Sequence, residues 1–444
     1  MSLDYKSIKT DNMKKYKYIH QPSILIGNEL KEVNILIEND RIIKISEEEI
    51  PNLPSQTQII EAKGLTLLPG IIDIHVHFRQ PGLEHKADML SESRAAVAGG
   101  VTTVFDMPNT LPPTTNLKAL TEKINLAKEN MLCNYKFYLG ITNNNLQEAL
   151  SIDPSLICGY KIYLGSSTGD MLVDKAQAIE GLFEKSNLII TAHCEDEKRI
   201  RENTKKYKEI YPDNDAPATI HPLVRDSEAC YLSTKFAIGL TNQNTRLNIA
   251  HITSEKELSL LKSGKIDSKN ITAEVSPVHL WFEEKDFERL GNKIKCNPSI
   301  KAKSDRDALR KALREDKIDF VATDHAPHLM EEKEKPYFQA PSGLPSIQFS
   351  LNIMLELVRQ GELKLSQVQE KMCHNPATYF HLEDRGYIKE GYYADLVLVD
   401  LNGKTKVTND IVLSKCKWSA FEGETFNSKI VATFVNGEEV YSQK

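Results

Sequence analysis

The sequence predicts a TIM-like (β/α)8 barrel joined to a small β-sandwich domain that both ends of the chain build together. Through the middle of the chain, eight short apolar runs rich in β-branched residues alternate with longer helical stretches. This alternation is typical of a parallel sheet covered by helices, and eight repeats favour a closed barrel. Both ends of the chain instead carry short strand-like runs separated by turns. A length of 444 residues suits one large domain with a smaller partner.

The two ends of the chain account for the β-sandwich. The N-terminal region contains the runs YIHQPSILIGN, KEVNILIENDRIIKIS and QIIEAKGLTLLPG, and the C-terminal region contains ADLVLVDL and IVATFVNGEEVY. We expect half-buried antiparallel strands in both regions, paired into one domain. The predicted division assigns 14–70 and 385–444 to the β-sandwich and 71–384 to the barrel.

The eight apolar runs account for the barrel. They are IIDIHV (71–76), VTTVFDM (101–107), CNYKFYLGI (133–141), ICGYKIYL (157–164), NLIITAHC (187–194), LNIAHI (247–252), ITAEVS (271–276) and DFVATD (319–324). A barrel places its catalytic groups at the carboxyl ends of such strands. A doubly wound open sheet is the alternative fold, but the sequence has no GxGxxG motif and no phosphate-binding loop to support it.

Composition excludes several classes of function. The net charge of -6 is modest, and the 56 basic residues are scattered, which argues against a nucleic-acid partner. No apolar run approaches the ~18 residues of a membrane helix, and the polar start lacks the apolar region of a signal peptide. The seven cysteines form no CxxC pair, so a reducing compartment fits best. These features predict a cytoplasmic protein without a membrane partner.

The run GIIDIHVHFRQPG carries two histidines at alternate positions of its apolar pattern. Side chains two apart on a strand point the same way, about 6.5 Å apart along it, so His75 and His77 could hold one metal ion between them. Asp73 would add polar support. Taken alone, an HxH pair is a weak signal and is more often incidental than a ligand set.

Further polar residues end other predicted barrel strands. His193 ends the fifth, His251 the sixth and Asp324 the eighth, and each alone could be an ordinary core or cap residue. Together at one rim they favour a ligand, because a buried polar cluster without one leaves donors unpaired. Lys161 ends the fourth strand; it could reach solvent or pair with a carboxylate. As a neutral amine it could instead add carbon dioxide, and the carbamate would bridge two metal ions that activate a shared water.

These residues resemble the amidohydrolase superfamily and, within it, the dihydroorotases. The similarity runs from about 68 to 441 through the motifs DIHVHFRQPGLEHKAD, FDMPNT, GYKIYLGSSTG, AHCED, AHIT, TAEVSP, KCNPSIK, VATDHAPH and SKCKWSAFEGETFNSKIVATFVNGEEVY. The resemblance implies two divalent metal ions, usually zinc, and reversible cyclisation of N-carbamoyl-L-aspartate to L-dihydroorotate in pyrimidine biosynthesis. It implies that His75, His77 and Asp324 hold one metal, that His193 and His251 hold the other, and that carboxylated Lys161 bridges them.

The resemblance also implies roles around the substrate. Asp324 would act as general acid and base, taking a proton from the metal-activated hydroxide and passing it to the leaving nitrogen. Arg79 would clamp the substrate carboxylate with its planar fork, although a lone arginine there could equally form a rim salt bridge. The remaining implied substrate contacts, each an ordinary loop residue when taken alone, are Asn109, Asn297, His328, Ser342 and Gly343.

The chain departs from the family pattern in one place and leaves alternatives open. Many relatives have two histidines in a PHHL run after the seventh strand, where this chain has Val278 before His279. The charged run MEEKEKPYFQ, within 328–345, is expected to be a solvated loop over most of its residues. Its place just after Asp324 also makes it a candidate lid over the substrate. Hydantoinases or dihydropyrimidinases and allantoinases share the metal set, but their neutral rings offer no carboxylate for Arg79.

A non-catalytic scaffold in an assembly is the remaining alternative. Such proteins tend to lose metal ligands, and this sequence has all six. A homodimer is a family-level expectation, as is an association with aspartate transcarbamoylase.

Overall fold

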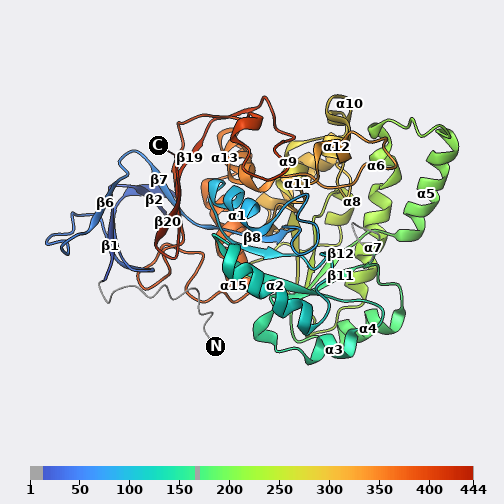
Figure 1. The fold of residues 1–444 in the computed structure, drawn as a ribbon, viewed down its shortest axis with the longest axis horizontal. Helices are drawn as coiled ribbons and strands as arrows, with labels where there is room; N and C mark the ends of the chain where they lie inside the picture. The colour runs from blue at the N-terminus through green and yellow to red at the C-terminus, as the bar shows by residue number, and fades with distance from the viewer. Residues whose placement is uncertain (1–13, 166–170, 444) are drawn as a thin grey trace.

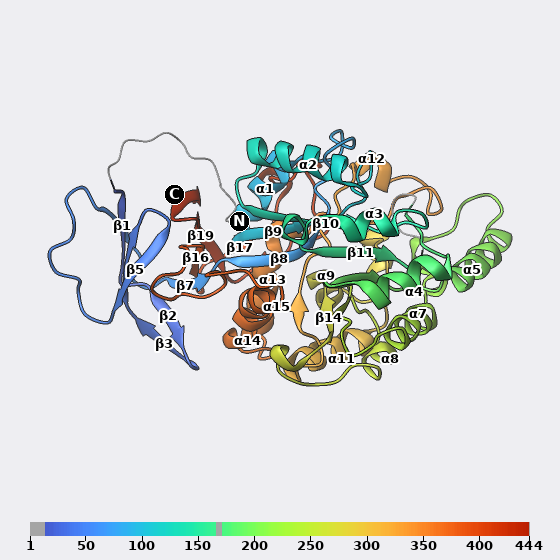
Figure 2. The ribbon, with the colours of Figure 1, turned by 90° about the horizontal axis from the view of Figure 1, so that it is seen from below.

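The computed structural model describes residues 14–165 and 171–443, and its centre is a barrel of eight parallel strands (Figures 1 and 2). These strands are β8 (Ile71–Val76), β9 (Val101–Asp106), β10 (Asn134–Gly140), β11 (Gly159–Tyr163), β12 (Ile190–His193), β13 (Leu247–Ile249), β14 (Ile271–Val275) and β15 (Phe320–Val321). They pair in chain order. A parallel bridge from Val76 to His325, and a hydrogen bond from the His77 N–H to the His325 carbonyl (2.8 Å), join β8 to the segment after β15. The predicted barrel is confirmed.

Helices surround the barrel, as Figure 2 shows for the face that carries α2, α3 and α4. Asp88, Asn116, Asp196 and Asp226 cap α1, α2, α5 and α7, because each side chain accepts a hydrogen bond from a backbone N–H of the first turn. The α-helices are α1 (Met89–Ala98), α2 (Leu117–Asn130), α3 (Leu146–Ser151), α4 (Ala176–Lys185), α5 (Glu197–Ile210), α6 (His221–Val224), α7 (Ser227–Gly239), α8 (Glu255–Leu258), α9 (Pro277–Trp281), α10 (Asp286–Leu290), α11 (Lys303–Arg314), α12 (Met330–Lys333), α13 (Ser350–Arg359), α14 (Leu365–Gln369) and α15 (Asn375–Tyr379).

Two sheets from the chain ends lie beside the barrel, at the left of Figure 1. One has the order β5-β4-β1-β6, with β1 (Tyr16–His20), β4 (Asn34–Glu38), β5 (Arg41–Ser46) and β6 (Gln58–Glu61). The other has the order β20-β19-β16-β7-β2-β3, with β2 (Ser23–Ile26), β3 (Glu29–Glu32), β7 (Thr66–Pro69), β16 (Leu396–Asp400), β19 (Lys429–Val435) and β20 (Glu438–Ser442). A short pair, β17 (Thr405–Lys406) and β18 (Thr425–Phe426), completes the strands.

One apolar cluster joins the two sheets. It contains Ile35 and Ile37 from the first sheet together with Leu67, Leu396 and Phe434 from the second. This packing of sheet on sheet agrees with the predicted β-sandwich from both termini. Most strand pairs are antiparallel, as expected, but β1 pairs with β6, and β2 with β7, in parallel.

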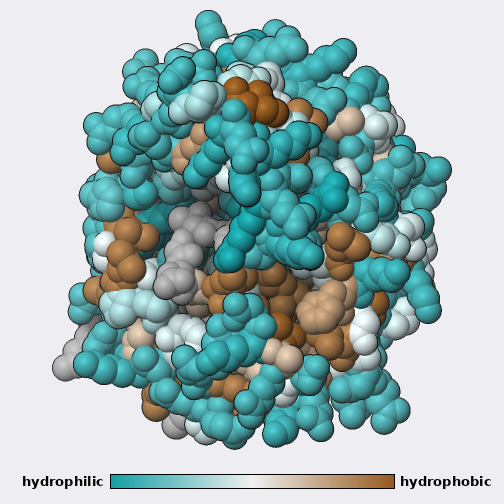
Figure 3. All heavy atoms as spheres, turned by 90° about the vertical axis from the view of Figure 1, so that its right-hand side faces the viewer, coloured by the Kyte–Doolittle hydropathy of each residue, from teal (hydrophilic) through white to brown (hydrophobic). Residues whose placement is uncertain are grey.

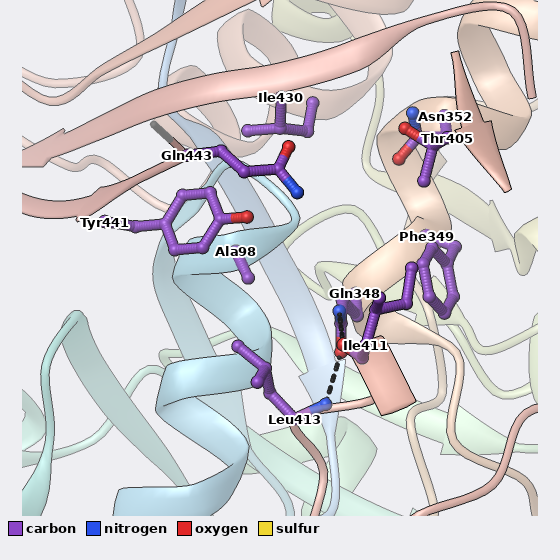
Figure 4. Close-up of a pocket in the computed structure, with 10 residues that line it drawn as sticks. All are labelled: Ala98, Gln348, Phe349, Asn352, Thr405, Ile411, Leu413, Ile430, Tyr441 and Gln443. Carbon is purple, nitrogen blue, oxygen red and sulfur yellow. Dashed lines mark hydrogen bonds between the residues drawn. The ribbon is translucent and has the colours of Figure 1, made fainter. Parts of the chain in front are cut away.

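The second sheet runs directly into the barrel. Gly70 separates β7 from β8 and packs so closely that a Cβ there would lie 2.2 Å from the Thr102 hydroxyl oxygen. A cavity of about 210 Å³ lies nearby, between α1, α13 and the C-terminal strands (Figure 4). The Gln348 side chain in its wall donates to the Ile411 carbonyl (2.7 Å) and accepts from the Leu413 N–H (2.8 Å). None of the predicted site residues lines this cavity.

The opposite end of the molecule carries apolar side chains at its surface. Figure 3 shows them gathered in a hollow on the side where α5, α6 and α7 lie. Leu232 and Phe236 of α7 are among the exposed apolar residues there. Within 14–165 and 171–443, no helix has the length and apolar character that crossing a membrane requires.

Candidate metal centre

The six predicted metal ligands lie at the carboxyl ends of the barrel strands. His75 is in β8 and His77 follows it, Lys161 is in β11, and His193 ends β12, while the other two, His251 and Asp324, follow β13 and β15 closely. The four histidines and Lys161 are buried, and the Asp324 side chain is 16% exposed. His251 (φ 37°) and Asp324 (φ 49°) adopt the left-handed backbone region, a strain that is common at functional sites.

His75, His77 and Asp324 form one group of converging ligand atoms. Their nearest ligand atoms all lie within 4.8 Å of one another. The Nε2 atoms of His75 and His77 lie 3.3 and 2.9 Å from the same Asp324 oxygen, Oδ1. The other ring nitrogen of His75 contacts the Glu274 carboxylate, and that of His77 lies 2.7 Å from the Asn109 side-chain oxygen.

These outer contacts decide which ring nitrogens carry protons. Carboxylate and amide oxygens only accept, so Nδ1–H of His75 donates to Glu274 and Nδ1–H of His77 donates to Asn109. Both Nε2 atoms then present lone pairs toward Asp324 Oδ1, which is itself an acceptor. Three lone pairs meeting without a proton between them fit a cation, and His, His and Asp are ligands that zinc prefers.

His193 and His251 form a second pair. His193 Nδ1 lies 3.0 Å from His251 Nε2, and the other nitrogen of His193 lies 2.9 Å from a Glu195 oxygen. Because Nε2–H of His193 donates to Glu195, Nδ1 of His193 carries no proton, and its lone pair faces the His251 ring. The imidazoles of His75 and His251 lie 5.4 Å apart between centroids, so the two groups are neighbours.

The Lys161 ammonium is the unsatisfied member of the centre. Its side chain is 0% exposed, and within the described residues Nζ has no hydrogen-bond partner. Burial lowers the pKa of Lys161 to about 8, which favours the neutral amine that carbon dioxide requires. His251 Nδ1 is likewise buried without a partner among the described residues. Both observations fit a site whose buried nitrogens take a bound group as their partner.

Burial also lowers the pKa of His77, His193 and His251 and so favours their neutral form. It lowers the pKa of His77 to about 4 and the pKa of His251 well below its usual value. A neutral imidazole is the form that binds metals.

Four of the predicted substrate contacts lie together on one side of the site. Arg79 is buried, and its Nη2 lies 3.1 Å from Nε2 of His328, which lies 3.1 Å from the Ser342 carbonyl oxygen. Gly343 has φ 130°, and a Cβ there would lie 2.7 Å from the Ala326 carbonyl oxygen, so the close approach requires glycine. Arg79, His328, Ser342 and Gly343 therefore form one corner of the site, while Asn109 contacts His77.

The Asn297 side-chain oxygen forms no hydrogen bond to that corner among the described residues. This oxygen is buried and has no hydrogen-bond partner within the described residues. Val278 packs in an apolar cluster with Phe282, so it supplies no polar contact where relatives have a histidine. The last four residues of the GYKIYLGSSTG motif, 166–169, lie outside the described residues.

Most residues of the charged run 330–339 are exposed or half-buried, as expected of a solvated loop, but two are not. Lys333 of this run is buried, and its ammonium donates to the carbonyl oxygens of Lys295 (3.0 Å), Pro341 (2.9 Å) and Gly343 (2.8 Å). Tyr337 is buried as well. Lys333 departs from the expected loop because its ammonium satisfies three backbone oxygens.

Sequence reasoning missed two carboxylates that orient the ligands. Glu274 of β14 contacts His75 and accepts from the Asn248 amide (3.0 Å). Glu195 contacts His193 and the Arg225 guanidinium. Both stand inside motifs named above, TAEVSP and AHCED, but which histidine each carboxylate reaches depends on the barrel geometry.

Comparison with known proteins identifies the family. The model of the Amidohydrolase family matches residues 66–440. The chain belongs to the amidohydrolase family. Amidohydrolases generally use binuclear metal centres, and the His75, His77 and Asp324 group is the corresponding candidate site here.

Relatives of this amidohydrolase narrow the reaction class. The dihydroorotase of Methanosarcina acetivorans is 33% identical, over 91% of this chain and 88% of its own. That of Halobacterium salinarum is 36% identical over 80% and 82%, and that of a Wolbachia of Drosophila simulans is 31% identical over 100% of both. An L-hydantoinase (dihydropyrimidinase) structure from Arthrobacter aurescens matches with TM-score 0.90 at 25% identity, over 97% and 96%. The prediction of a cyclic amide hydrolase is confirmed.

Proposed function

We propose that this amidohydrolase is a dihydroorotase, which interconverts N-carbamoyl-L-aspartate and L-dihydroorotate in pyrimidine biosynthesis. The named relatives support the proposal across most of the chain. The observation that carries it is Arg79, a buried cation beside the candidate metal centre.

Arg79 has surroundings that suit the binding of a carboxylate. The residue is 2% exposed, and its Nε donates to the Pro327 carbonyl (3.1 Å). Within the described residues, Arg79 forms no ion pair with an Asp or Glu side chain. A buried guanidinium is costly unless an anion pairs with it, and its planar fork suits a carboxylate. Dihydroorotate carries such a carboxylate, whereas the rings of hydantoin and allantoin are neutral.

The proposed metal ligands are those that the family resemblance implies, and the geometry described above supports them. His75, His77 and Asp324 would hold one divalent ion, His193 and His251 the other, and Lys161 would bridge them as a carbamate. Zinc is the ion proposed. When bound, two such ions lower the pKa of a water toward ~7 and polarise a carbonyl.

Asp324 would carry the proton in both directions. Its carboxylate lies among the ligands at the strand ends and is the most exposed of the six, so it can reach the attacking water and the substrate. In hydrolysis, Asp324 would take the proton of the attacking water and give it to the ring nitrogen that leaves. In cyclisation, it would remove the proton from the ureido nitrogen. Arg79, with Asn109, Asn297, His328, Ser342 and Gly343, would bind and orient the ring.

A hydantoinase or dihydropyrimidinase activity is the second candidate. The similarity to the Arthrobacter L-hydantoinase structure supports it, whereas Arg79 favours the anionic ring. Allantoinase activity and a non-catalytic scaffold have no observation here in their favour. A homodimer, an association with aspartate transcarbamoylase and a cytoplasmic location stay predictions.

Substrate preference tests the proposal. Purified protein supplied with zinc should hydrolyse dihydroorotate with a kcat/KM well above those for hydantoin and allantoin. We expect Arg79→Met to raise the KM for dihydroorotate by about 100-fold with a smaller change in kcat, because the lost contact serves mainly binding. Steady-state kinetics at matched metal content measures both. A preference of the unaltered protein for either neutral ring would refute the dihydroorotase assignment.

A further inference from the structure

Lys86 contacts His328, a member of the corner that Arg79, His328, Ser342 and Gly343 form. It has no role in the assignments above. Its ammonium Nζ lies 3.1 Å from Nδ1 of His328 and 2.8 Å from Oε1 of Glu332, and its side chain is 14% exposed. His328 itself is buried, with its side chain 1% exposed. Lys86 thus reaches the ring nitrogen of His328 that faces away from Arg79.

This contact selects one tautomer of His328. A lysine ammonium can only donate, and the Glu332 oxygen that faces the same nitrogen lies 3.7 Å away, beyond hydrogen-bond distance, so Nδ1 of His328 accepts from Lys86 and carries no proton. Burial and the nearby Arg79 keep the pKa of His328 well below its usual value, so the ring is neutral and its single proton is on Nε2. Nε2–H then donates to the Ser342 carbonyl oxygen at 3.1 Å.

The tautomer decides what Arg79 can bind. Nη2 of Arg79 also lies 3.1 Å from Nε2 of His328. If Nε2 carried no proton, it would accept from Arg79, and the guanidinium would be satisfied within the protein. The lone pair of Nε2 would also face the Ser342 carbonyl oxygen, which is unfavourable. With the proton on Nε2, His328 offers no acceptor to the Nη2 hydrogen of Arg79 that faces it at 3.1 Å, so this hydrogen needs an external anion as its partner.

The surroundings hold Lys86 and His328 in this arrangement. The second oxygen of Glu332 accepts from the Leu329 N–H (2.9 Å), which anchors the carboxylate that orients Lys86. The indole Nε1–H of Trp418, from the C-terminal segment, donates to the His328 carbonyl (2.7 Å). His328 is therefore fixed from its ring and from its backbone.

We propose that Lys86 is a positioning residue that sets the His328 tautomer and thereby keeps the Arg79 fork open for the carboxylate of the substrate. The inference rests on the proposed function for the identity of that substrate. The tautomer itself does not depend on the substrate.

Kinetics of Lys86 variants tests the consequence. Lys86→Met should raise the KM for dihydroorotate by about 10- to 100-fold while kcat changes less than about threefold. The reason is that one N–H of Arg79 would then bond to His328 and no longer to the substrate carboxylate. Lys86→Arg, which also only donates, should restore most of the affinity. Lys415→Met is the matched control, since Lys415 binds the same loop at Glu84 and Asp88 but does not contact His328. An unchanged KM in Lys86→Met, or a parallel fall in kcat and metal content, would refute the proposal.

Nitrogen-15 NMR of the histidine rings tests the tautomer directly. His328 should show a protonated Nε2 in the unaltered protein, with its signals assigned by their loss in His328→Asn. A protonated Nδ1 in the unaltered protein would overturn the inference whatever the kinetics. If dihydroorotate is not turned over at all, the proposed function fails, and this spectrum still decides the part played by Lys86.

Discussion

Asp324→Asn is expected to lower kcat by about 10³-fold, because asparagine cannot accept the proton that the attacking water releases. The substitution keeps a side-chain oxygen in place and removes the charge that His75 and His77 surround. Steady-state kinetics on dihydroorotate, with the metal content of the same sample, separates proton transfer from metal loss.

Asp319→Asn is the matched control for this variant. Asp319 precedes the same strand, β15, and pairs with Lys269 at the opposite end of the barrel from Asp324. We expect it to reduce stability and to leave the kcat of the folded protein near that of the unaltered enzyme. A kcat for Asp324→Asn within about threefold of the unaltered value, with full metal content, would contradict the proton-transfer role.

Lys161→Met is expected to abolish measurable activity, a loss of about 10³-fold or more, and to lower the bound zinc below two ions per chain. Without a bridging anion, two neighbouring cations repel each other in a site of low dielectric constant. Zinc is measured by atomic emission after dialysis against a weak chelator, and activity is measured on dihydroorotate.

Lys136→Met provides the comparison for Lys161→Met. Lys136 stands on the neighbouring strand β10 and is only half buried, so its loss should leave both zinc ions and the activity in place. Reconstitution of the metal-free protein should require bicarbonate for the unaltered enzyme. Two zinc ions per chain and unchanged activity in Lys161→Met would exclude a bridging carbamate.

The barrel could be predicted because its signal is local. Each of the eight apolar runs contains an observed strand, although β15 shortens to Phe320–Val321. The polar residues that end these runs could be assigned to one rim, since a barrel brings all its carboxyl ends together. The meeting of His75, His193 and Asp324 near one centre follows from the same geometry.

Other features depend on partners that the sequence pattern does not specify. The sequence pattern of a half-buried strand is the same whether its neighbour runs parallel or antiparallel, so the expected antiparallel sheet did not anticipate the parallel pair of β1 and β6. Lys333 stands in a charged run typical of a surface loop, but three backbone carbonyls make its burial favourable. Glu274 belongs to an apolar strand, and only the fold brings it to His75. The domain boundaries stay a prediction.

Anomalous diffraction from crystals of the zinc-supplied protein tests the central claim most directly, because it locates the ions without reference to activity. The account predicts two zinc peaks at the carboxyl end of the barrel. One should lie about 2.0–2.2 Å from His75, His77 and Asp324, the other about 2.0–2.1 Å from His193 and His251, with density for a carboxylated Lys161 between them. Zinc absent from this end of the barrel, or bound only by other residues, would contradict the account.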